Sequence, residues 1–316
     1  MDDLEGKVAL VTGASRGVGA ATAVALAEAG CDVACAARAT ERSPQRTAGT
    51  LDETVRRIEA TGRRGLSIPT DLAVDDDVIA MVHAAQEYFG RLDILVNNAA
   101  ITFIGDLDIP LKRYDLVMQV NLSAPLIAIR EAAPLMAAGD GGTIINISSE
   151  AALYPHPSLL AYGISKIGLE RLTVDAARQL APSNISVNCF RIDIAVASEG
   201  FLANAPGADH SDWEPSEVAA EGIVWMARQP VSYSGHRESM LALRGREGIM
   251  ASRLAHPTTH VPRTELFDGL APAVGPDYFE EPYPDEPGGE AGGGAGGGGA
   301  GGGAGGGAGG GAGEAQ

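Results

Sequence analysis

The stretch "TGASRGVG", residues 12–19, decides the fold, because it joins a strand-like run to a helix-like run. The apolar run "KVALV" (7–11) precedes it, and residues 18–29 follow it with helical periodicity. Its glycine spacing is G-x-x-x-G-x-G, formed by Gly13, Gly17 and Gly19. A glycine-rich turn at a helix N-terminus places free backbone N–H groups where an anion is stabilised. The stretch therefore predicts a phosphate-holding loop, although it lacks the Lys-Ser/Thr of a P-loop.

The composition divides the chain near residue 254. Before that point, apolar segments are evenly spread, as in an ordinary globular protein. After it, the chain is first rich in Pro, Asp and Glu, and from residue 288 it is nearly pure Gly and Ala. Such a composition buries too little apolar surface to offset chain entropy. We therefore expect one well-buried α/β domain over residues 1–254 and a disordered tail over residues 255–316.

Charge and cysteine content exclude several classes of protein. The net charge is −18, and without a basic stripe this argues against nucleic acids and anionic membranes as partners. No apolar run reaches membrane-spanning length, and "MDDLEGK" (1–7) lacks the apolar core of a secretory signal. The three cysteines and six histidines show no metal-ligand spacing. We expect a cytoplasmic protein with reduced thiols and no metal.

Strand-like and helix-like segments alternate along the domain. After the first strand, the expected strands are residues 31–38, 65–72, 92–100, 141–149, 185–190 and "ESMLAL" (238–243). The expected helices are residues 18–29, 52–61, 75–89, 111–137 with an interruption near Asn121, 160–180 and 215–228. This alternation predicts a single doubly wound Rossmann domain, whose mostly parallel, seven-stranded sheet binds ligands at the carboxyl ends of its strands.

Tyr162 and Lys166 stand four residues apart in "AYGISK" (161–166), which places both side chains on one face of a helix. A phenol is a poor base at neutral pH, because its pKa is near ~10. A neighbouring ammonium favours the phenolate and lowers that pKa, so the pair could exchange a proton with an alcohol or ketone oxygen. By itself the spacing could also arise by chance.

Together, these motifs resemble the short-chain dehydrogenases/reductases that carry TGxxxGxG, NNAG and Ser…YxxxK. The likeness covers residues 7 to about 250, and "NNAA" (97–100) departs from the usual motif only at its last residue. The polar insertion "ATERSPQRTAGTLDETV" (39–55) is similar to a loop of hydroxysteroid-dehydrogenase-like members. The resemblance implies an oxidoreductase that acts on alcohol and carbonyl groups.

The resemblance also implies the catalytic roles. Tyr162 would be the acid/base, and Lys166 would lower its pKa and bind the nicotinamide ribose. Ser149 would hydrogen-bond the substrate oxygen, with Ser148 as the rival candidate. Asn121 would interrupt a helix and hold a water in the proton relay. Structural readings compete, since Ser149 could cap a strand end and Asn121 could mark an ordinary helix irregularity.

Residues at the strand ends are implied to bind the cofactor. Asp71 would meet the adenine, or could instead cap the next helix, and Asn97 and Ala99 would line the cleft. The implied set is Gly13, Ser15, Arg16, Gly17, Val18, Gly19, Arg38, Asp71, Leu72, Asn98, Ala99 and Ala100, together with Tyr162 and Lys166.

The second strand ends at Ala37, where an NAD-binding enzyme of this fold usually carries an acidic residue. Arg16 and Arg38 suit a 2′-phosphate through charge-assisted contacts. The sequence therefore favours NADP(H), with NAD(H) as the alternative.

The sequence departs from the family pattern at "VNCFRIDIAVASEGF" (187–201), which lacks the usual Pro-Gly. Arg191, Asp193 or Ser198 could substitute there for the missing cofactor contacts. Nearby apolar side chains could line a substrate pocket or could simply pack between helices. They are Leu153, Tyr154, Phe201, Leu202 and Trp213.

We therefore expect an NADP(H)-dependent oxidoreductase for a small apolar alcohol or carbonyl substrate. The alternatives are an NAD-dependent alcohol dehydrogenase of the same family and a non-catalytic cofactor-binding module. The resemblance implies a homo-oligomer, dimer or tetramer, assembled through the helix that bears Tyr162. The aromatics of "FDGLAPAVGPDYFEEPYP" (267–284) could dock on a neighbouring subunit.

Overall fold

The computed structural model describes residues 4–154, 156–204, 207, 209–255 and 257. All of these residues belong to one compact unit. The expected disordered tail and its aromatic segment lie outside the described residues from residue 258 onward, so the domain boundary near residue 254 stays a prediction.

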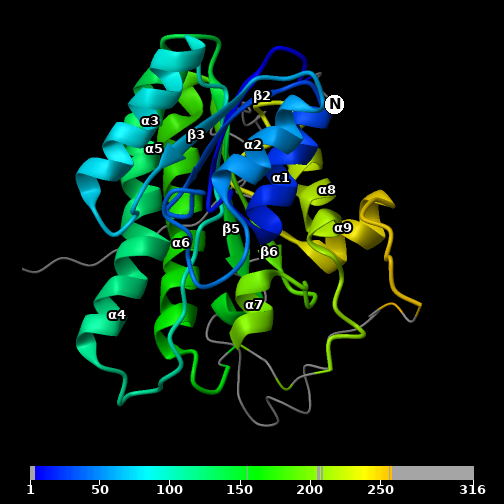
Figure 1. Cartoon of the computed structure of the whole chain (residues 1–316). Coiled ribbons are helices and arrows are strands. Elements are labelled where there is room, and N and C mark those ends of the chain that lie inside the picture. Colours follow the sequence, from blue (N-terminus) through cyan, green and yellow to red (C-terminus); the bar gives the residue numbers. More distant parts are fainter. Residues whose placement is uncertain (1–3, 155, 205–206, 208, 256, 258–316) are drawn as a thin grey trace, which may run out of the picture. The chain divides into compact units, whose positions relative to one another are not determined.

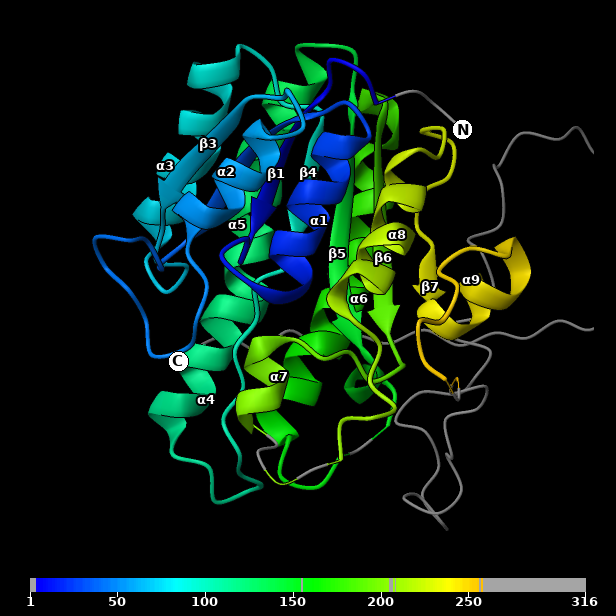
Figure 2. The same ribbon diagram turned by 45° about the vertical axis from the view of Figure 1, so that its right-hand side comes forward.

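The centre of the unit is a seven-stranded sheet in the order β3-β2-β1-β4-β5-β6-β7, in which every neighbouring pair is parallel (Figure 2). The chain starts in the middle with β1, winds outward to β3, and returns to place β4 on the other side of β1. This reversal of direction is the switch point at which doubly wound sheets bind ligands. The strands are β1 (Val8–Thr12), β2 (Asp32–Ala37), β3 (Gly65–Pro69), β4 (Ile94–Asn97), β5 (Gly142–Ser149), β6 (Ile185–Ile192) and β7 (Arg237–Ser239).

Helices cover both faces of the sheet, as the alternation of segments predicts (Figure 1). One face carries α1 (Gly17–Glu28), α2 (Leu51–Glu59) and α8 (Ser216–Ala227). The other carries α3 (Asp75–Phe89), α5 (Ala124–Ala137) and α6 (Leu160–Leu180). The remaining α-helices are α4 (Leu111–Met118), α7 (Glu199–Asn204) and α9 (Met240–Glu247). Of these, α4 leads into α5.

The core consists of two apolar layers, one on each face of the sheet. All five residues of β1 are buried, because the strand is covered from both sides. Leu26 of α1 and Ile223 of α8 pack in the first layer, and Val82 of α3 and Ile129 of α5 pack in the second. This burial makes the sheet a rigid platform for the residues at its edges.

The expected last strand, "ESMLAL" (238–243), is mostly wrong. The strand ends at Ser239, whose Oγ accepts a hydrogen bond from the backbone N–H of Ala242 at 3.0 Å and so caps α9. The residues from Met240 onward are good helix formers, and the capping serine turns them into a helix. The short helix α7 also went unpredicted, because six residues carry too little periodicity to be recognised.

Candidate active site

The parallel sheet brings the predicted site residues to one edge. Thr12 of β1 pairs with Ala36 of β2, so these strands end nearly level, whereas β5 pairs with Asn97 of β4 at Asn146 and continues to Ser149. The polar residues that follow these strands therefore gather at the carboxyl edge of the sheet, around the switch point.

The glycine-rich loop requires its glycines for two different reasons. Gly13 and Gly17 have φ values of +70° and +56°, in the left-handed region that favours glycine. At Gly19, a Cβ atom would lie 2.4 Å from both the Asn98 Nδ2 and the Gly13 carbonyl oxygen, closer than real contacts allow. The loop leads into α1, whose first turn carries no acidic residue and whose N-cap, Arg16, makes no capping bond. The cradle is therefore narrow and suited to an anion.

Thr12 and Asn98 hold this loop against the end of β4, an arrangement that the sequence did not predict. The Thr12 Oγ accepts hydrogen bonds from the backbone N–H groups of Asn98 (3.0 Å) and Ala99 (3.1 Å). In return, the Asn98 Nδ2 donates to the Thr12 carbonyl at 2.8 Å. In the sequence, the only indication of these hydrogen bonds is a threonine at the end of an apolar strand. Asn98 thus packs against the glycine-rich loop, whereas Ala100 is exposed to solvent.

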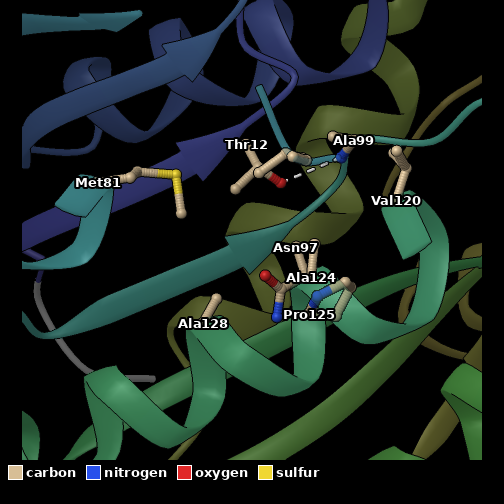
Figure 3. A pocket seen from close by; sticks show the side chains of 9 residues that line it. Thr12, Met81, Asn97, Ala99, Val120, Ala124, Pro125 and Ala128 are labelled. Atoms are coloured by element: carbon tan, nitrogen blue, oxygen red, sulfur yellow. Dashed lines mark hydrogen bonds between the residues drawn. The ribbon is translucent and has the colours of Figure 1, made fainter. Parts of the chain in front are cut away.

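Beneath this loop lies a small pocket, lined by Thr12, Asn97 and Ala99 together with apolar side chains of α3 and α5 (Figure 3). The Asn97 Nδ2 donates to the Asn146 Oδ1 at 2.9 Å, so this side chain ties two strands together. Leu72 lines the same pocket, and Asp71 is half-buried, with its Oδ1 accepting from the backbone N–H of Ala73 at 3.1 Å.

Two arginines lie at the loop: Arg16 belongs to it, and Arg38 follows the end of β2. Arg16 donates from Nη2 to the Gly49 carbonyl at 3.2 Å, while its buried Nε has no hydrogen-bond partner among the described residues. Arg38 is exposed and lies near enough to Arg16, together with Glu199, to affect its pKa. Burial lowers the pKa of the Arg16 guanidinium, and Glu199 opposes this. The polar insertion (39–55) lies against the glycine-rich loop, since a Cβ on Gly49 would lie 2.5 Å from the Ser15 carbonyl.

Tyr162, Lys166 and Ser149 come together at the end of β5. The Lys166 Nζ lies 5.5 Å from the centre of the Tyr162 ring and donates to the Ile147 carbonyl at 2.7 Å. Ser149 hydrogen-bonds Tyr162, and its Oγ also accepts from the backbone N–H of Ala151 at 3.3 Å. Ser148 instead donates to a buried glutamate, away from this group. Of the two serines, only Ser149 therefore reaches the tyrosine.

The pKa of Tyr162 is raised rather than lowered, which corrects the expectation from the Tyr–Lys spacing. Burial of the phenol raises its pKa, and the hydrogen bond with Ser149 offsets part of this rise. Burial also lowers the pKa of Lys166 to about 8, against opposing effects of Cys189 and Glu170. Desolvation therefore dominates both groups, because the low dielectric disfavours whichever form is charged.

Asn121 lies in a π-helical turn, Gln119–Ser123, at the expected interruption between α4 and α5. Its Nδ2 donates to the Ile101 carbonyl (2.9 Å) and to the Ser165 Oγ (3.0 Å), and its Oδ1 accepts from the Ile101 N–H (2.9 Å). The Ser165 Oγ in turn donates to the Tyr162 carbonyl at 2.7 Å. The buried carboxamide thus joins the segment after β4 to the helix that bears the tyrosine.

The end of β6 and the residues that follow it show how the chain continues without Pro-Gly. Arg191 lies in an ion pair with the buried Glu170, and Asp193 accepts from Ser239 (2.5 Å) and from the Leu241 N–H (3.0 Å). These two candidates are therefore directed into the protein.

Ser198, in contrast, reaches the glycine-rich loop, since a Cβ on Gly17 would lie 3.0 Å from the Ser198 Cβ. It immediately precedes α7, whose Glu199 approaches the same place.

Aromatic side chains gather between α7 and α8. Phe201 stacks on Trp213 with ring centroids 4.4 Å apart, and His210, which the sequence did not single out, lies 4.3 Å from Trp213. Phe201 remains 45% exposed. Leu153 and Tyr154 are half-buried. This segment forms an apolar surface rather than a packed helical interface.

Two further findings bear on the site. Within the described ranges, no group of three or more His, Cys, Asp or Glu side chains could hold a metal ion. Of the helices that the structure describes, none combines the length and apolar character needed to cross a membrane.

Comparison with known proteins identifies the family. The family model for short chain dehydrogenase matches residues 7–195. The chain is 35% identical over 247 residues to the short chain dehydrogenase/reductase astE of Aspergillus oryzae, covering 73% of this chain and 91% of that protein. It is 30% identical over 291 residues to hydroxysteroid dehydrogenase-like protein 2 of Pongo abelii, covering 89% of this chain and 65% of that protein. The chain thus spans less than two-thirds of that relative.

Solved structures agree. A short chain dehydrogenase from Burkholderia cenocepacia in complex with NADP matches with a TM-score of 0.66 and 32% identity, over 75% of this chain and 97% of that chain. One from Mycobacterium paratuberculosis bound to NAD matches with a TM-score of 0.66 and 28% identity, over the same shares. From its sequence, its fold and these matches, the chain belongs to the short-chain dehydrogenase family of NAD(P)-dependent oxidoreductases.

Proposed function

We propose that the protein transfers hydride between NADP(H) and the alcohol or carbonyl group of a small apolar substrate. The observation that carries this proposal is the group of Ser149, Tyr162 and Lys166 at the same carboxyl edge of the sheet as the glycine cradle. Such a group can bind an oxygen atom and exchange a proton with it, and the cradle fits a pyrophosphate.

Each residue has a separate task in the proposed mechanism. The Ser149 hydroxyl, which is already hydrogen-bonded to Tyr162, orients the substrate oxygen beside the phenol. Tyr162 gives its proton to that oxygen in reduction and takes it back in oxidation. Lys166, held by the Ile147 carbonyl, would stabilise the phenolate that remains and would bind the ribose of the cofactor. The nicotinamide, when bound, supplies or accepts the hydride. Asn121 keeps the tyrosine's helix in place through Ser165.

The preference for NADP(H) over NAD(H) rests on the charges at the end of β2. Arg38 is exposed there with no ion-pair partner among the described residues, and Arg16 holds a buried Nε without a hydrogen-bond partner in the same region. Ala37 occupies the place where a carboxylate would bind a ribose 2′-hydroxyl. Two cations, with no carboxylate at the end of β2, favour a 2′-phosphate, although Glu199 lies near Arg16.

We also propose that the apolar surface of Phe201 and Trp213 contacts the substrate, and that the protein is a cytoplasmic homo-oligomer. The aromatic surface supports an apolar substrate, because it is partly exposed and follows Ser198 at the cradle.

Three buried free cysteines suit a reducing compartment. Leu126 of α5 and Ile164 of α6 are each more than 40% exposed, as expected for a face that pairs with another subunit.

A spectrophotometric screen tests the proposed reaction. Oxidation of NADPH and of NADH is followed with the full chain and a panel of apolar ketones and aldehydes. We expect carbonyl-dependent oxidation, faster with NADPH, that Tyr162→Phe lowers by about 10²-fold or more without loss of cofactor binding. Turnover by Tyr162→Phe at the wild-type rate would refute the assigned mechanism.

A further inference from the structure

Three consecutive residues at the end of β5 hold three residues of α6 that lie one helical turn apart. Tyr162, Lys166 and Glu170 occupy positions i, i+4 and i+8 and therefore share one face of α6. The contacts join Ser149 to Tyr162, the Ile147 carbonyl to Lys166 at 2.7 Å, and Ser148 to Glu170 at 2.8 Å. The first two belong to the proposed mechanism, and the third has no role in it.

Glu170 is fully buried and is bound by more than Ser148. Arg191 of β6 donates from Nε to the Glu170 Oε1 (2.8 Å) and from Nη2 to Oε2 (2.7 Å), which is a bidentate ion pair. Ser148 and Arg191 are register partners in the sheet, so one carboxylate fastens α6 to two neighbouring strands. A buried pair of this kind contributes little net stability compared with apolar residues, which favours a purpose other than stability.

The groups facing Lys166 from α6 and β6 show what that purpose could be. They are Tyr162 and Glu170 on its own helix, and Cys189 on β6, which in turn lies near Arg191. Burial raises the pKa of the Cys189 thiol far above neutrality, so this group carries no charge. Glu170 is therefore the anionic group that favours the ammonium form of the buried lysine.

We propose that Glu170, fixed by Arg191 and Ser148, is a positioning residue that keeps Lys166 charged and in place beside Tyr162. This inference rests on the proposed function, because it assigns Glu170 a role through Lys166. It also gives a reason for an arginine near the end of β6, since Arg191 holds the Glu170 carboxylate.

The test measures cofactor binding as a function of pH rather than turnover. The dissociation constant of NADH is measured by fluorescence between pH 7 and 10 for the wild type and Glu170→Gln. Burial lowers the pKa of Lys166 to about 8, so wild-type affinity should fall as pH rises through that value. The Lys166→Met variant shows whether this fall in affinity is due to Lys166, because a variant without the lysine should not show the fall. In Glu170→Gln we expect the transition to move down by about one pH unit, the usual effect of removing a neighbouring opposite charge.

A second variant covers the chance that Glu170→Gln leaves Arg191 unpaired and fails to fold. The double variant Glu170→Gln/Arg191→Met removes both charges and is expected to fold, since it leaves no unpaired charge buried. Its NADH affinity at pH 7 should be about tenfold weaker, because α6, which carries Lys166, loses its attachment to β6. Asp32→Asn is the matched control: it neutralises a largely buried carboxylate paired with Arg64 at the opposite edge of the sheet and should leave the transition unchanged.

The inference is overturned if the double variant binds NADH as the wild type does, with the same transition. It is also overturned if Asp32→Asn shifts the transition as much as the Glu170 variants do. These failures differ from failure of the proposed function, which is judged by the turnover of Tyr162→Phe. If the Glu170 variants bind NADH as the wild type does and Tyr162→Phe is inactive, only the positioning role of Glu170 is refuted.

Discussion

Replacing Arg38 with Ala should weaken NADPH binding about tenfold and leave NADH binding unchanged. Arg38 is exposed at the end of β2 and has no ion-pair partner among the described residues, so its truncation removes no contact that holds the fold. A hydrogen bond to a charged group contributes about 1.5–3 kcal/mol. Because solvent screens an exposed guanidinium, we take the lower end, which corresponds to about a tenfold change in the dissociation constant. NADH carries no phosphate at this place.

The assay compares dissociation constants and kcat/KM for NADPH and NADH in wild type and Arg38→Ala. Arg57→Ala is the control, since it removes an equally exposed arginine from α2. Adding Ala37→Asp to Arg38→Ala should go further and favour NADH, because the new carboxylate repels a phosphate and accepts from a ribose hydroxyl. A wild type that already prefers NADH would refute the reasoning, as would an Arg38→Ala variant that binds both cofactors equally poorly.

Three further predictions concern the site. Tyr162→Phe should lower turnover by about 10²-fold or more and keep NADPH affinity, as kinetics and fluorescence titration can show. Gly19→Ala should lower cofactor affinity and melting temperature together, because the added Cβ would lie 2.4 Å from the Gly13 carbonyl; an unchanged melting temperature would contradict this. Burial lowers the pKa of Lys166 to about 8, so the folded chain releases this proton before the unfolded chain does. Unfolding free energy should therefore rise by about 2 kcal/mol from pH 8 to 10, measured by urea denaturation relative to Lys166→Met.

The sequence by itself determined the architecture and the candidate catalytic residues. The helix Asp75–Phe89 and the helix Leu160–Leu180 were predicted with their observed bounds, because long periodic segments reflect local preferences and burial on one face. The parallel sheet followed from the alternation of strands and helices, and the carboxyl edge followed from the sheet. Tyr162 and Lys166 could be paired without coordinates, since helical spacing alone places them together.

Only the tertiary structure decided what those residues contact. The neighbouring serines, Ser148 and Ser149, look equivalent in sequence, yet one binds Glu170 and the other Tyr162. Such choices depend on side-chain direction and on segments far apart in the chain, as with Thr12 and Asn98, 86 residues apart. The direction of the Tyr162 pKa was likewise wrong from sequence, because desolvation depends on how tightly the folded chain surrounds the phenol. Local patterns encode which elements form, whereas the electrostatics of the site arise only when those elements exclude water together.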